Sequence, residues 1–152
     1  METHRIADQL KRSVEGPAWH GPSVMEIVRD ITASEAFARP IPAAHSTWEI
    51  LLHVSAWERE ALRTLDGRPY TVLAGEADWP PVSEASGAAW NDVLRAFLQD
   101  HERLVSAIRA LPDDKLEEAI PGTEFTFYFL LHGVVQHNLY HAGQIAMLKK
   151  AL

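Results

Sequence analysis

Two histidines stand four residues apart in the last long apolar stretch of the chain, residues 127–150. His137 and His141 occupy positions where the apolar stripe of a helix would continue. Residues four apart on a helix share one face, with Cβ atoms ~5–6 Å apart, so both imidazoles can reach one metal ion. A third histidine, His53, lies on the apolar stripe of another predicted helix. Three imidazoles are typical of a catalytic zinc-like site, which keeps a coordination position free for water or substrate.

The spacing by itself is weak evidence for a metal. With eight histidines in 152 residues, chance alone gives roughly 0.4 pair at spacing four, and short motif matches have a high false-positive rate. The alternative is that each ring is a hydrogen-bonded histidine of the core. The coincidence of three imidazoles on apolar stripes favours the metal site, with His53, His137 and His141 as its ligands.

Four further residues are candidates for the surroundings of such a site. His101 lies on an apolar stripe, where a packed, hydrogen-bonded role is the commoner one and a fourth ligand or a support for the ligands is the alternative. Trp57 lies one helical turn beyond the third histidine and would contact a site built there. His20 and Trp19 lie between two Gly-Pro pairs, where they could border a pocket mouth, although a solvated loop is the commoner setting for such a histidine.

The elements that must position these side chains are predicted to be helices. Apolar residues recur at helical spacing in four regions, the first of which is built in two pieces separated by Gly-Pro breaks: residues 3–15 with a second piece from Ser23, residues 46–66, residues 90–111 and residues 127–150. Ser23 with Glu26 and Ser46 with Glu49 fit the capping box that opens a helix. The alternation in residues 124–129 could also indicate a strand, but we interpret it as the start of the last helix.

This pattern predicts an all-α fold, an antiparallel four-helix bundle with the metal site between its second and fourth helices. A long loop over residues 67–84 contains Trp79, and a loop of that length usually covers something. The chain length and its 47% hydrophobic content fit one domain over residues 1–152.

Composition narrows the classes of partner and the compartment. The formal net charge is −7 and no run of Lys or Arg is present, which excludes a phosphate-tracking surface and hence a nucleic-acid partner. No apolar run reaches the ~18–20 residues of a membrane span, and the first residues lack the pattern of a secretion signal, so we expect a cytoplasmic protein without a membrane partner. There is no cysteine, so metal ligands must be His, Asp or Glu.

Three segments make the chain similar to DinB-like proteins, whose superfamily includes metal-dependent hydrolases and bacillithiol- and mycothiol-dependent transferases. They are Ala18–Val24 (AWHGPSV), Ile41–Trp57 (IPAAHSTWEILLHVSAW) and Leu131–Ile145 (LHGVVQHNLYHAGQI). The resemblance runs over nearly the whole chain and places the family's histidine triad on His53, His137 and His141. It also implies a four-helix bundle, zinc or nickel in the site and frequent homodimers, but no particular substrate.

Two classes of function follow from these observations. The first is an enzyme that acts on a small-molecule substrate with the metal as its only strong electrophile, because the sequence contains no Ser-His-Asp set, acidic dyad or phosphate loop. The ion could lower the pKa of bound water for hydrolysis, or bind the thiolate of an external low-molecular-weight thiol for transfer; the sequence does not choose between them. The second is a non-enzymatic metal-binding or stress-associated bundle. Apolar side chains beyond one stripe of the last helix predict a homodimer. The alternative is that the loop over residues 67–84 folds back over that face within one chain.

Overall fold

Four long helices form the body of the protein in the computed structural model, which describes residues 1–152. Each long helix packs on two others, so that the order around the bundle is α1, α5, α4, α6. Their bounds are α1 Glu2–Glu15, α4 Thr47–Leu65, α5 Gly87–Ala110 and α6 Phe127–Lys150. The predicted all-α, four-helix bundle is confirmed, and the three histidines lie between α4 and α6, the second and fourth of its long helices.

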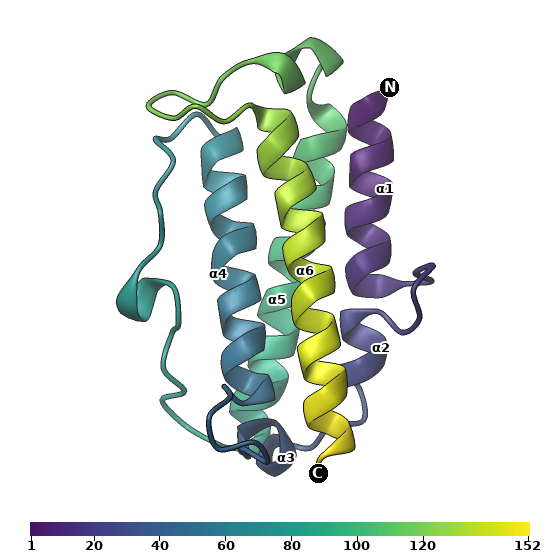
Figure 1. The fold of residues 1–152 in the computed structure, drawn as a ribbon, viewed down its shortest axis with the longest axis vertical. Helices are drawn as coiled ribbons and strands as arrows, with labels where there is room; N and C mark the ends of the chain where they lie inside the picture. The colour runs from purple at the N-terminus through teal and green to yellow at the C-terminus, as the bar shows by residue number, and fades with distance from the viewer.

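The directions of the helices follow from the paths of their connections. Figure 1 shows α1 and α6 running one way and α4 and α5 running the other way. The chain between α4 and α5 returns along the outer side of α4 to the end where α4 began. That long connection, residues 66–86, contains the short 3-10 helix η1, Gly75–Ala77. The predicted antiparallel packing therefore holds for α4 with α6 and for α1 with α5, whereas neighbouring α4 and α5 run in parallel, as do α1 and α6.

Short helices and capping boxes fill the crossover between α1 and α4. The capping boxes predicted at Ser23 and Ser46 are both present. The piece after Ser23 is shorter than its apolar pattern indicates, because α2 spans only Val24–Val28. A further single-turn helix, α3 Ala33–Phe37, has its own capping box at Thr32 and was not predicted. A second 3-10 helix, η2 Asp113–Glu117, follows α5. The possible strand at residues 124–129 is a single bridge, and α6 starts at Phe127 as predicted.

The apolar core consists of two clusters separated by a layer of polar side chains. One cluster surrounds Trp48 and Phe97, and the other surrounds Leu10 and Leu104. Each long helix contributes one fully buried polar residue between them: Ser13, Glu58, His101 and Asn138. Glu58 is hydrogen-bonded to His101 and to Asn138, which offsets part of the free-energy cost of burying these groups, while Nε2 of His101 and Oδ1 of Asn138 have no partner. No helix of the fold is both long enough and apolar enough to span a membrane.

Candidate metal centre

Helices α4 and α6 bring the three predicted ligands together. The Nε2 atom of His137 lies 3.0 Å from Nε2 of His53 and 3.1 Å from Nε2 of His141. His53 and His141 are 6% and 5% exposed, and His137 is partly buried. These three side chains are also the one group of potential metal ligands whose ligand atoms all lie within 4.8 Å of one another.

This geometry fits a small divalent transition ion. An ion bonded to two imidazoles at about 2.0–2.1 Å in tetrahedral geometry would place their nitrogen atoms about 3.3 Å apart. The observed separations around His137 are within a few tenths of that value. Three imidazole nitrogen atoms that converge in this way offer three ligand atoms to a cation placed between them. The cluster therefore suggests a divalent metal site.

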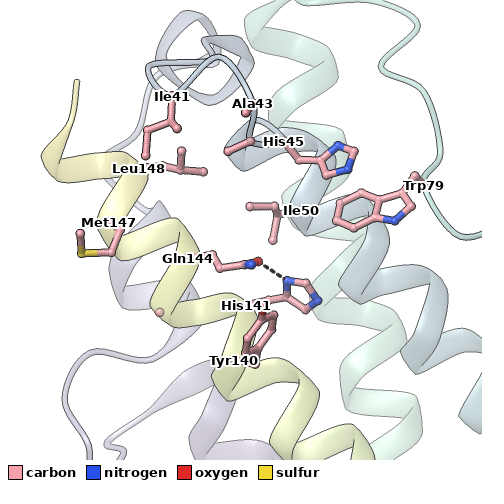
Figure 2. A pocket seen from close by; sticks show the side chains of 12 residues that line it. Ile41, Ala43, His45, Ile50, Trp79, Tyr140, His141, Gln144, Met147 and Leu148 are labelled. Atoms are coloured by element: carbon pink, nitrogen blue, oxygen red, sulfur yellow. Dashed lines mark hydrogen bonds between the residues drawn. The ribbon is translucent and has the colours of Figure 1, made fainter.

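Hydrogen bonds on the outer side of two of the rings fix which nitrogen faces the cluster. The Nδ1–H of His53 faces the backbone oxygen of Asp78 at 2.7 Å and its carboxylate Oδ1 at 3.1 Å. The Nδ1–H of His141 donates to Oε1 of Gln144 at 2.7 Å, the bond drawn in Figure 2. Because Nδ1 carries the proton in both rings, Nε2 presents a lone pair to the centre, as a metal ligand must.

The electrostatics of the cluster keep His137 and His141 neutral. Burial is the main cause that lowers the pKa of His137 to about 3, and positive charge on His141 or His53 lowers it further. Burial also lowers the pKa of His141, against the opposing effect of its hydrogen bond to Gln144. Without a cation at the centre, both rings are therefore neutral at pH 7. Neutral imidazole is the form that binds metal.

The long connection between α4 and α5 covers the centre with two consecutive residues. The carboxylate of Asp78 accepts a hydrogen bond from Nε1 of Trp57 at 2.7 Å, in addition to its contacts with His53. The indole of Trp79 lies between two imidazoles, stacked on His53 at 3.9 Å between ring centroids and on His45 at 3.6 Å. The prediction that this loop covers something is thus confirmed. It shields one side of the three-histidine cluster from solvent.

Two pockets reach the cluster from different sides. The His141 pocket, shown in Figure 2, has a volume of about 670 Å³; among its lining residues are His45, Trp79, Tyr140 and Gln144. The His137 pocket is smaller, about 220 Å³, and aromatic side chains dominate its walls; its lining residues are Trp57, Tyr70, Ile120, Phe125, Phe129, Leu130, Gly133, Val134 and His137. A small molecule in either pocket would touch one of the three imidazoles.

The comparison with protein families agrees with this geometry. A family model described as the DinB superfamily matches residues 19–145, which include all three histidines of the cluster. The chain belongs to the DinB superfamily. No curated protein and no solved structure matches it. Membership and the buried histidine cluster together support a metal-binding protein, whereas no reaction follows from the match.

In this DinB-superfamily chain, the polar core layer holds His101 away from the cluster. His101 is fully buried, and its Nδ1 lies 3.0 Å and 3.1 Å from the two carboxylate oxygens of Glu58. The same carboxylate accepts a hydrogen bond from Asn138 at 2.6 Å. The packed, hydrogen-bonded role described from the sequence is the one that the fold gives His101. It is not among the side chains whose ligand atoms meet at the centre.

The remaining candidates divide between the site and the opposite side of α6. Trp57 lines the His137 pocket, as expected for a residue one turn beyond His53. Trp19 is fully exposed, and with His20 it borders a different hollow near Arg12. Neither lines a pocket that touches the histidine cluster, because the turn after α1 projects from the α1 side of the bundle, away from α4.

Sequence reasoning missed two residues of the DinB-superfamily site. Gln144 follows His141 by three positions, a spacing at which helical side chains meet, so the sequence did contain a signal for it. Asp78 lies 25 positions after His53 in an irregular segment, and no periodicity connects the two. Only the path of the loop along α4 brings its carboxylate to the imidazole.

Proposed function

We propose that the protein is a metal-dependent enzyme in which His53, His137 and His141 hold one zinc or nickel ion, and that it hydrolyses a small molecule. The observation that carries the proposal is the convergence of three Nε2 atoms beside two pockets. No fourth His, Asp or Glu joins the group. Three protein ligands leave a position for water or substrate, as in catalytic rather than structural zinc sites.

A divalent ion in such a set supplies the chemistry by polarising a carbonyl group and by lowering the pKa of a coordinated water to about 7. The protein residues bind and orient. Asp78 and Gln144 hold the rings of His53 and His141 with their lone pairs inward. Trp79 covers the face of His53 and keeps bulk water from that side. The two pockets hold the substrate beside the cluster.

Hydrolysis is favoured over thiol transfer by the charge of the pockets. No Lys or Arg lines either pocket. A thiol cosubstrate that carries carboxylates, such as glutathione, would have to leave water without a cationic partner, which is unfavourable. Transfer to a low-molecular-weight thiol is thus the second candidate. It suits a chain without cysteine, which cannot supply a thiol of its own.

The test begins with metal content. We expect about one zinc or nickel ion per wild-type chain by elemental analysis, and loss of that ion in the His137→Ala and His141→Ala double variant, because one imidazole cannot hold it. His132→Ala is the matched control, since His132 lies on the same helix outside the cluster. Metal retained in the double variant, or absent from the wild type, would refute the proposal.

Activity is then measured on the metal-loaded protein with neutral aryl and alkyl esters and amides, with and without glutathione, bacillithiol or mycothiol. Metal-dependent turnover without a thiol supports the hydrolase. Turnover that appears only with a thiol supports the transferase instead. A metal-loaded protein inactive under both conditions fits the non-enzymatic reading, in which the ion only joins α4 to α6.

A further inference from the structure

Two glycines interrupt α6 on either side of its histidine pair. Gly133 lies one turn before His137, and Gly143 lies two residues after His141. Glycine in the interior of a helix destabilises it relative to alanine, because the unfolded chain loses more conformational freedom. The presence of two interior glycines in α6 therefore requires an explanation from the residues around them.

Neither backbone geometry nor packing supplies that reason. The glycines that adopt positive φ are elsewhere in the chain, in turns and caps. A Cβ atom built on Gly133 or on Gly143 would meet no atom within 4 Å, so no neighbouring element approaches either residue closely. What the two positions share is open space: Gly133 lines the His137 pocket and Gly143 lines the His141 pocket. The missing side chains leave room in the two pockets that touch the cluster.

The charge of these two pockets sets them apart from the other hollows of the surface. Neither contains a Lys, Arg, Asp or Glu side chain, although 23% of the residues of the chain are charged. The other three sizeable hollows each include charged side chains, among them Arg12, Glu102 and Asp8. A ligand of the two pockets would therefore leave water most easily if it carries no net charge.

The His137 pocket has the size and composition of a site for a flat apolar group. Its walls contain four aromatic side chains, of which Phe125 and Phe129 are stacked at 4.9 Å between centroids. The ring of Trp57, another of these side chains, stands edge-on to the ring of His137, with 6.2 Å between their centroids. Its volume of about 220 Å³ exceeds the roughly 150 Å³ of an apolar cavity that binds benzene. A substituted aromatic ring fits this space, with its polar substituent directed at the imidazoles.

We propose that the His137 pocket binds the aromatic ring of an uncharged substrate whose polar reacting group lies at the three histidines, and that Gly133 determines this specificity. The inference extends the proposed function by naming the substrate class, a neutral aryl ester or amide. Ring binding itself requires only the pocket, so it can be measured with and without metal. Gly143 provides a matched position, because it opens the other pocket on the same helix.

The test uses benzamide as a neutral probe and benzoate as its anionic counterpart, titrated by saturation-transfer NMR against the 152-residue protein. In metal-free protein we expect benzamide to bind at least about tenfold more tightly than benzoate, because no cation faces the carboxylate. Gly133→Leu should weaken benzamide binding by at least about tenfold through occupation of the pocket, and Gly143→Leu by less than about twofold. Gly133→Ala, a smaller obstruction, should have an intermediate effect.

Melting temperatures show whether the variants remain folded, and both leucine variants should melt no lower than the wild type because leucine favours a helix over glycine. Equal weakening by the two leucine variants, no weakening by either, or benzoate binding as tight as benzamide in metal-free protein would overturn the inference. So would a change of molecular mass in Gly133→Leu, which would assign the space to a second copy of the chain. A protein that binds benzamide but no metal would refute the proposed function alone.

Discussion

Removal of the Asp78 carboxylate should weaken metal binding, although Asp78 is not a ligand. In Asp78→Ala, the Nδ1–H of His53 loses the carboxylate oxygen at 3.1 Å but keeps the backbone oxygen of residue 78 at 2.7 Å. The Nε1–H of Trp57 loses its acceptor altogether. The hydrogen bonding that orients the His53 ring is therefore weakened rather than abolished.

The expected magnitude follows from this partial loss. Removal of a group that supports a metal-ligating histidine typically lowers affinity 10- to 100-fold. Because the stronger of the two acceptors remains, we expect about tenfold, equivalent to about 1.4 kcal/mol. The hydrogen bond between His141 and Gln144, both on α6, should remain in this variant.

The assay is competition for zinc against a fluorescent chelator of known affinity. Glu76→Ala is the matched control, because Glu76 is an exposed carboxylate in the same 3-10 turn and its removal changes the net charge equally. If Asp78→Ala and Glu76→Ala bind zinc equally well, the carboxylate does not support His53, and the role assigned to the loop is wrong. A loss well beyond 100-fold would instead indicate that Asp78 itself coordinates the ion.

Three further predictions concern pH, the core and association. For pH, the pKa of His137 is about 3 in the folded, metal-free protein against an ordinary value of 6.5. Between these two pH values the unfolded chain therefore binds a proton that the folded chain does not. The free energy of unfolding should fall as pH drops from 6.5 towards 3. Urea titrations should show a shallower fall in His137→Gln; an unchanged slope would contradict this. For the core, His101→Leu leaves the Glu58 carboxylate buried without its imidazole partner, which should cost about 3 kcal/mol of stability. Adding Glu58→Leu to this variant should recover part of the lost stability. Strictly additive losses of the two substitutions in chemical denaturation would argue against the pairing. For association, Tyr128 is 43% exposed on α6 and lines neither pocket, and we expect light scattering to give twice the 17.0 kDa of one chain, decreasing in Tyr128→Glu, whereas a wild-type mass of one chain would exclude the dimer.

The polar layer shows why the sequence predicted the helices but not every side chain's partner. Helix starts are encoded locally: Ser46 and Glu49 satisfy each other's backbone groups within four residues, so the capping box can be identified without the fold. Glu58 and His101 are 43 positions apart, and each alone resembles a solvent-facing or a metal-binding side chain. Their pairing depends on the contact between α4 and α5, which local patterns do not specify.

The sequence by itself determined the four long helices and placed three imidazoles on their apolar faces, since helical periodicity and capping are properties of neighbouring residues. The position of His137 and His141 on one face was likewise fixed by their spacing of four. Tertiary structure alone decided that the loop after α4 lays Asp78 and Trp79 against His53, and that Trp19 and His20 lie away from the cluster. Irregular segments lack a periodic pattern from which their path could be predicted. The positions of their side chains therefore depend on contacts with residues distant in the chain.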